Sequence, residues 1–98
     1  MAEFRLSQRA RDDLIDIYFD GAEKFGRYQA EAYFSGLERS FGLIADFPMI
    51  GVSADELVPG LRRFRFQSHV IFYTMEAGHV FIRAIVHGRQ QARPALFE

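Results

Sequence analysis

Arginine and histidine side chains that could do chemistry are concentrated between Leu61 and Arg93 of this 98-residue chain. They alternate with apolar residues in the segments LRRFRF, HVIFYTM and HVFIRAIVHGR, and Glu76 is the one acidic residue among them. Burying a cation among apolar side chains is costly unless it faces a groove or a partner. The stretch therefore predicts a surface that meets something anionic or strongly hydrogen-bonding.

The guanidinium groups and imidazole rings of this stretch suit two kinds of chemistry. Arginine pairs with carboxylate or phosphate through two parallel hydrogen bonds, and histidine, with an ordinary pKa of about 6.5, can transfer protons. His69 and His87 could act in this way, or each could hold a structural hydrogen bond to the backbone. The structural interpretation is favoured because the sequence offers no obvious second proton-transfer group. His79 falls in a predicted turn, where we expect a plain surface position.

The sequence does not indicate a metal or cofactor site. The chain has no Cys, and the spacing of its three His is not that of a metal site. A Gly-rich phosphate loop is also missing. Asp12, Asp13 and Asp16 stand near the start of a predicted helix, where carboxylates interact favourably with the helix dipole and with solvent. We therefore expect no metal and no cofactor.

Charge is distributed unevenly along the chain, although the formal net charge is only −1. Residues 1–56 contain 11 acidic and 6 basic side chains, whereas residues 57–98 contain 2 acidic and 6 basic ones. Every basic residue except Lys24 is Arg. The basic C-terminal part predicts a face that meets an acidic partner or nucleic acid, and a chance surface composition is the alternative.

Length and composition indicate a single domain, residues 1–98, with one small core. The absence of Cys excludes a disulfide framework. The start, MAEFRLSQ, lacks the apolar segment of a secretory signal, and no apolar run approaches the roughly 18–20 residues of a membrane span. We expect a cytoplasmic protein with no membrane partner.

Periodicity predicts a short strand over residues 3–6 and two helices after it. Ser7 is a good N-cap for the first helix, and Gly26 is a good residue to end it. The second helix is expected over residues 28–46, and Pro48 and Gly51 follow it. The apolar stripe of the first helix is Ala10, Leu14, Ile17, Tyr18, Ala22 and Phe25. That of the second is Ala30, Tyr33, Phe34, Leu37, Phe41, Ile44 and Ala45.

The second half of the chain predicts a loop over residues 48–60 and three strands over 61–66, 69–76 and 79–86. Ala77 and Gly78 stand at a tight hairpin between the last two strands, and residues 89–98 form a tail. The order is β-α-α-β-β-β. It predicts an α+β fold, in which an antiparallel helical hairpin packs on one face of a mostly antiparallel sheet and leaves the other face partly open.

Alternation along the strands predicts which side chains face the helices. From the last strand, those expected to face the helices are Val80, Ile82, Ala84 and Val86, and those expected on the opposite face are Phe81, Arg83, Ile85 and His87. In the first of the three strands we expect Phe64 and Phe66 to be buried, and Arg63 and Arg65 to share the opposite face. Both alternating sets of the middle strand are largely apolar, so their faces stay unassigned.

Three segments, in this order, resemble the ParE/RelE superfamily of bacterial toxin–antitoxin toxins. FRLSQRARDDLIDIY is similar to the family's opening strand and helix. GLRRFRFQSHVIFY resembles the ParE signature in the second and third strands, and VFIRAIVHGRQQARPALF resembles the ParE ending. The resemblance covers nearly the whole chain and implies the RelE/ParE-like fold.

The superfamily contains two activities, and the sequence favours one of them. RelE-like members resemble ribosome-dependent mRNA endonucleases, and ParE-like members are implied to poison DNA gyrase. Val70 stands where RelE-like chains tend to carry Arg, and no Tyr, His or Lys follows Arg89. The chain also has only one Lys, which is few for a protein that must bind ribosomal RNA. We therefore expect a gyrase-directed toxin of the ParE type that is not an enzyme and does not bind nucleic acid directly.

The ParE resemblance implies a ParD-like antitoxin that wraps its C-terminal segment around the toxin in a hetero-oligomer. Eleven Phe and four Tyr are many for a small domain, and Phe19, Phe47 and Phe97 fit neither helical stripe, so we expect exposed aromatic side chains at an interface. A degenerate, non-toxic member of the family that only binds its partner is a third hypothesis.

Nine residues are candidates for binding the antitoxin or gyrase. They are Arg62, Arg63, Arg65, His69, Tyr73, Arg83, His87, Arg89 and Phe97. For Tyr73 packing in the core is the alternative, and for Arg83 it is an ion pair with Glu76 or a stem that reaches solvent. If the protein were an endonuclease, Arg65, Arg83 and His87 would stabilise charge and transfer protons.

Overall fold

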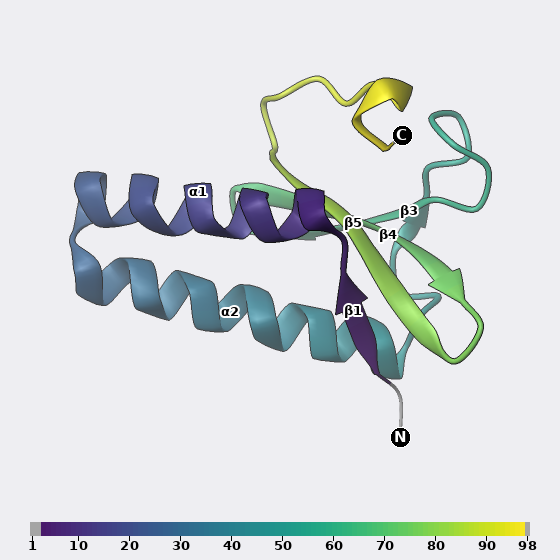
Figure 1. Cartoon of the computed structure of the whole chain (residues 1–98), viewed down its shortest axis with the longest axis horizontal. Coiled ribbons are helices and arrows are strands. Elements are labelled where there is room, and N and C mark those ends of the chain that lie inside the picture. The colour runs from purple at the N-terminus through teal and green to yellow at the C-terminus, as the bar shows by residue number, and fades with distance from the viewer. Residues whose placement is uncertain (1–2, 98) are drawn as a thin grey trace.

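A helical hairpin covers one face of a five-stranded sheet (Figure 1). The structure is a computed structural model that describes residues 3–97, so Glu98 of the predicted tail lies outside the described residues. In chain order the elements are β1 (Phe4–Leu6), α1 (Gln8–Phe25), α2 (Arg27–Asp46), β2 (Val52–Ser53), β3 (Arg62–Phe66), β4 (His69–Glu76), β5 (His79–His87) and the 3-10 turn η1 (Pro94–Phe97). The predicted β-α-α-β-β-β order is confirmed, and the short β2 is added where a loop was expected.

The strands are arranged in the order β1-β5-β4-β3-β2. β1 runs parallel to β5, and the other neighbouring pairs are antiparallel. The first and last strands of this order, β1 and β2, are therefore the edges of the sheet. β1 spans only three residues, so most of β5 has no strand beside it on that edge.

Side chains of α1 and of its N-cap residue Ser7 take the place of the missing strand beside β5. The Ser7 hydroxyl caps α1 by accepting a hydrogen bond from the Ala10 amide at 3.0 Å, and it donates to the Arg83 carbonyl at 2.8 Å. The Asp13 carboxylate accepts from the Ile85 amide at 2.9 Å. Backbone groups of β5 that would otherwise be unpaired are satisfied in this way. The interpretation of Asp13 as a solvated, dipole-stabilising residue is therefore wrong.

The larger core lies between the helical hairpin and the sheet. Gly26, with a φ of 92°, is the one residue between the two helices, and this φ favours glycine. The predicted stripe of α2 is buried or half-buried, whereas Phe25 at the end of the α1 stripe is 67% exposed and does not join the core. The buried members of this core are Ala10, Leu14, Leu37, Phe41, Ile44, Ile71, Tyr73, Val80, Ile82 and Ile85.

A β-bulge in β5 reverses the alternation of its side chains. The register with β4 shifts between Phe72 and Tyr73, and Arg83 is the residue of β5 that has no partner there. An extra residue on one strand moves every later side chain to the other face. The prediction therefore holds for Val80 and Ile82 before the bulge, but it is wrong after it. The residues on the wrong predicted faces are Ile85 and His87, which lie on the side of the helices, and Ala84 and Val86, which do not.

A second, smaller core covers part of the sheet face that was expected to be open. It consists of Ala54, Leu61, Phe72, Ala84, Val86 and Phe97. The loop before β3 and the turn η1 bring these side chains onto the sheet, and the rings of Phe72 and Phe97 are 5.0 Å apart between centroids. Phe97 is only 6% exposed. The prediction that Phe97 is uncovered is therefore wrong, whereas Phe19 and Phe47 are exposed as expected.

The loop between α2 and β2 is held by one fully buried side chain. The Tyr73 hydroxyl donates to the Pro48 carbonyl at 2.7 Å and accepts from the Gly51 amide at 2.9 Å. Arg62 adds a bond from Nε to the Gly51 carbonyl at 3.1 Å. These contacts fix the position of the exposed residues in this loop. Neither α1 nor α2 is apolar enough over its length to cross a membrane.

Candidate functional site

The nine side chains predicted to bind a partner do not form one surface. Tyr73 and Phe97 are buried in the two cores. Arg62, Arg63 and Arg83 are half-buried and bonded within the chain. At the end of the sheet where β3 turns into β4 and β5 ends, the structure brings together Arg65, His69, His87 and Arg89.

Arg62 and Arg63 hold the loop segments that flank β2. Arg62 donates to the Gly51 carbonyl, as described above, and to the Met49 carbonyl at 3.3 Å. Arg63 pairs with Glu56 and lies 5.8 Å above the centre of the Phe72 ring. Both guanidinium groups are therefore engaged within the protein, although the buried Arg63 Nε has no hydrogen-bond partner among the described residues.

Arg83 fastens the C-terminal segment to the sheet. Its Nη2 donates to the Phe97 carbonyl at 3.0 Å, and its guanidinium carbon lies 5.1 Å from the centre of the Phe81 ring. The alternative ion pair with Glu76 is not formed among the described residues, and the Glu76 carboxylate accepts from the Thr74 hydroxyl. The Arg83 side chain extends from the sheet face that carries the second core, whereas the His87 side chain extends from the opposite face, toward the helices. The three residues considered for an endonuclease are therefore not brought together around one point.

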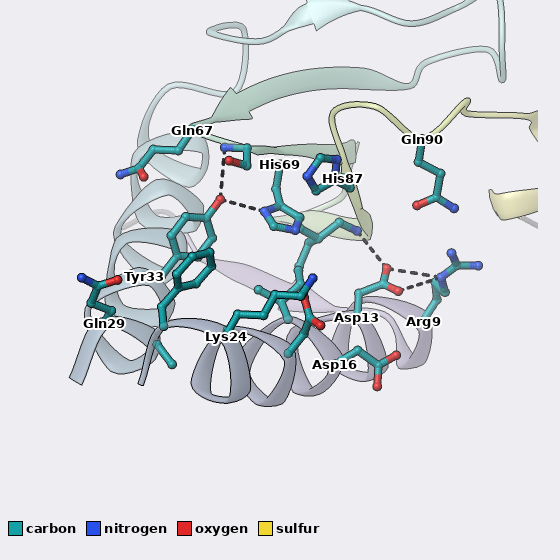
Figure 2. A pocket seen from close by; sticks show the side chains of 17 residues that line it. Arg9, Asp13, Asp16, Lys24, Gln29, Tyr33, Gln67, His69, His87 and Gln90 are labelled. Atoms are coloured by element: carbon teal, nitrogen blue, oxygen red, sulfur yellow. Dashed lines mark hydrogen bonds and ion pairs between the residues drawn. The ribbon is translucent and has the colours of Figure 1, made fainter. Parts of the chain in front are cut away.

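A groove of about 810 Å³ opens between the helical hairpin and the end of the sheet (Figure 2). Tyr33 of α2 and His69 of β4 point toward one another in it, and their hydroxyl and Nδ1 are 2.7 Å apart. The His69 and His87 rings are cross-strand neighbours with centroids 5.4 Å apart. The ionisable and aromatic side chains that line the groove are Arg9, Asp13, Asp16, Asp20, Lys24, Phe25, Tyr33, His69 and His87.

Each wall of the groove has its own chemistry. The α1 wall carries three carboxylates and two cations, and the cations are already paired. Arg9 Nε donates to Asp13 at 3.0 Å, and Lys24 Nζ lies 3.1 Å from the Asp20 carboxylate. The opposite wall is formed by the rings of Tyr33, His69 and His87. The groove is therefore aromatic on one side and acidic on the other.

Burial controls the protonation of the groove's half-buried aromatic groups. Burial lowers the pKa of His69, the neighbouring His87 lowers it further, and the Asp20 and Asp13 carboxylates oppose both effects. Burial also raises the pKa of Tyr33, against the hydrogen bond that its hydroxyl accepts from the Ser68 amide. Both side chains are therefore uncharged near neutral pH.

Acidification is expected to destabilise the protein through His69. Since the folded-state pKa lies below 6.5, the unfolded state takes up the proton first as the pH falls. The contribution of His69 is complete above pH 6.5 and is lost as the pH falls toward the lowered folded pKa. Urea unfolding of the wild type and His69→Gln between pH 7.5 and 5, a window of about 2.5 units that includes the ordinary pKa, checks this. We expect a shallower decline for the variant and an unchanged decline for Gln90→Ala, a non-ionisable control in the same groove.

Sequence patterns missed the groove because its residues come from distant parts of the chain. Tyr33 was assigned to the apolar stripe of α2, and its ring does pack there, but its hydroxyl reaches a turn 35 residues away in sequence. Asp13 meets β5 across 72 residues. Each of the two residues departs from the pattern around it. Tyr33 places a hydroxyl in an apolar stripe, and Asp13 places a carboxylate within reach of an unpaired strand edge.

Exposed apolar side chains form a separate surface at the opposite end of α2. We call these residues the α2-end patch: Leu43, Phe47, Met49, Ile50 and Val52. The patch runs from the last turn of α2 through the loop into the edge strand β2. Apolar side chains that remain uncovered in a folded domain indicate a binding surface. Further exposed apolar residues on the helical hairpin are Ile15, Phe19, Phe25 and Tyr28.

The fold defines the class of protein to which this chain is similar. A solved chain described as the chromosomal ParDE TA system from P. aeruginosa matches it with a TM-score of 0.77. The match covers 89% of this chain and 96% of that chain at 17% identity, so it establishes the shared fold.

Sequence comparison then gives the family. Residues 4–92 match the family described as the ParE toxin of the type II toxin-antitoxin system parDE. Toxin ParE1 of Caulobacter vibrioides is 35% identical over 96 residues, covering 98% of this chain and 99% of the relative. Toxin ParE1 of Mycobacterium tuberculosis is 30% identical over 89 residues, covering 90% and 91%. The chain belongs to the ParE toxin family of type II toxin–antitoxin systems, which confirms the expected resemblance.

Proposed function

We propose that this ParE-family protein inhibits DNA gyrase and that a ParD-like antitoxin neutralises it in a hetero-oligomeric complex. The observation that carries the proposal is the family match over residues 4–92, a range that includes both helices and all five strands. A gyrase inhibitor acts in the cytoplasm, where its target works.

The arrangement of the charged side chains supports binding rather than RNA cleavage. Metal-independent cleavage needs a base, an acid and cations around one phosphate. Arg83 and His87 extend from opposite faces of β5, and Arg65 donates to the Gln67 carbonyl at 3.0 Å. The groove that contains His87 has an acidic wall, which repels the phosphates of mRNA.

The α2-end patch is the surface on which we propose that the antitoxin docks. It borders β2, whose outer edge has no strand beside it in the sheet order. An edge strand with apolar neighbours can add a strand of a partner, and backbone hydrogen bonds then supplement apolar burial. The backbone of the loop that carries Met49 and Ile50 is held by Tyr73 and Arg62, so little ordering of the toxin backbone is needed on binding.

A supercoiling assay with purified gyrase tests the proposed target. We expect the protein to block supercoiling at a ratio near one toxin per gyrase, and prior addition of the antitoxin to restore it. A translation extract with the same protein is expected to show no mRNA cleavage. Full supercoiling at an excess of toxin rejects the gyrase target, and cleavage that is lost in Arg83→Ala would favour the endonuclease. Full gyrase activity together with tight antitoxin binding would indicate a non-toxic family member.

Polar substitutions in the α2-end patch are expected to weaken antitoxin binding. Phe47 and Met49 are 61% and 66% exposed, so Phe47→Ser and Met49→Ser should leave the fold intact and remove apolar contact area. We expect each to weaken binding by about tenfold, which corresponds to about 1.4 kcal/mol. Calorimetric titration measures the effect. Phe19→Ser, at 65% exposure on α1, is the matched control, and an equal loss there would place the antitoxin elsewhere.

A further inference from the structure

The groove beside the helical hairpin has a composition that the proposed function does not use. Its carboxylates outnumber its cations by three to two, and Asp16 has no ion-pair partner among the described residues. The Lys24–Asp20 pair is more than 60% exposed on both sides, and such a pair is readily exchanged. The acidic wall can therefore accept a further positive charge.

A metal ion does not fit this groove. His87 Nδ1 accepts a hydrogen bond from the Arg89 amide at 3.1 Å, so the proton of the neutral ring is on Nε2 and that nitrogen has no free lone pair. His69 Nδ1 is occupied by the Tyr33 hydroxyl. Residues 3–97 contain no group of three His, Cys, Asp or Glu that could hold a metal. An anionic ligand is disfavoured by the excess of carboxylates.

A planar cation fits both walls of the groove. The guanidinium group stacks on aromatic and imidazole faces and pairs with carboxylates through two hydrogen bonds. Tyr33, His69 and His87 supply the faces, and Asp20 supplies a carboxylate close enough to raise the pKa of His69. Ile17 and Phe25 line the same groove and can cover the methylene stem of an arginine.

We propose that this groove binds an arginine side chain of a protein partner, with the guanidinium group between the Asp20 carboxylate and the imidazole rings. The cavity volume exceeds that of one side chain, so neighbouring residues of the partner lie in the rest of the groove. The inference goes beyond the proposed function, because arginine binding to the free protein requires neither gyrase nor an antitoxin.

Titration with N-acetyl-arginine methylamide, followed by NMR of the imidazole nitrogens, tests the proposal. We expect shifts at His69 and His87 that saturate at about millimolar probe, as a single anchoring side chain allows. The uncharged isostere N-acetyl-citrulline methylamide should cause no saturable shift, and the lysine analogue should bind several-fold more weakly. Equal responses to arginine and citrulline, or to arginine and lysine, would overturn the proposal, as would saturation by inorganic phosphate in place of the arginine probe.

Two isosteric variants locate the binding site. Asp20→Asn should weaken binding of the arginine probe by about tenfold, the loss of one charge-assisted contact. Asp12→Asn is the matched control, because Asp12 is on the same helix, outside the groove, and accepts a bond from Gln8. It removes the same charge and should leave binding within about twofold, since exposed charges beyond a Debye length are screened. Equal weakening in both variants would mean that only net charge attracts the probe. The binding results for these two variants do not depend on whether the protein inhibits gyrase supercoiling.

Discussion

Replacing Gly51 with alanine is expected to lower the free energy of unfolding by about 3 kcal/mol. A Cβ at this position would lie 2.7 Å from the Arg63 carbonyl oxygen and 2.9 Å from Cε1 of Tyr73. The neighbours are a strand backbone and a fully buried ring, so neither can move aside without disturbing the core. The substitution is also expected to weaken the hydrogen bond from the Gly51 amide to the Tyr73 hydroxyl.

Urea unfolding of Gly51→Ala and of Gly42→Ala provides a matched comparison. Gly42 is in α2, and a Cβ built there meets nothing within 4 Å. Alanine in the interior of a helix is more favourable than glycine by about 0.5–1 kcal/mol, so Gly42→Ala should stabilise the protein. The two substitutions are thus expected to shift the urea midpoint in opposite directions. If the Gly51→Ala variant were as stable as the wild type, the loop would not be held by the contacts of Gly51 with Tyr73 and Arg63.

Replacing Phe97 with alanine is expected to lower the free energy of unfolding by about 3 kcal/mol. Its ring packs on Phe72 in the second core, where six residues are buried. Removing it leaves this core without its outer cover and weakens the hold of Arg83 on the C-terminal segment. Phe19→Ala, which truncates a ring that is 65% exposed, should change stability by less than about 0.5 kcal/mol.

Thermal and urea unfolding of the two Phe variants decide where the C-terminal segment lies. If Phe97→Ala unfolds like the wild type, the turn η1 does not cover the sheet in solution, and Phe97 would be available to a partner. Hydrogen exchange of the β4 and β5 amides gives a second measurement, since loss of the cover exposes the sheet locally. Faster exchange confined to residues near Phe72 would mean that the segment detaches without global unfolding.

Both substitutions affect segments that decide which surfaces a partner can reach. Gly51 fixes the loop that presents Met49, Ile50 and Val52 in the α2-end patch. Phe97 covers the sheet face on which Arg83 and exposed aromatic side chains were predicted from the sequence. The α2-end patch, one of the uncovered apolar surfaces of this protein, therefore lies beside the sheet, whereas the second core covers part of the face that was expected to be open.

The sequence by itself determined the helices, the order along the chain of every strand except the short β2, and the family. These features depend on local chemistry: the Ser7 cap, the single Gly26 between the helices and the apolar stripe of α2 are each properties of neighbouring residues. The motifs that resemble ParE toxins are also continuous segments, and comparison with known proteins confirms the family that they indicated.

Tertiary structure alone decided which face each side chain occupies and which distant groups meet. The bulge at Arg83 depends on how β5 pairs with β4, and it reverses the alternation that a sequence pattern assumes to be continuous. The groove requires Tyr33 and His69 to meet across 36 residues, and the second core requires the chain end to return to the sheet. Local periodicity contains no information about such contacts, because they form only when separate elements pack against one another.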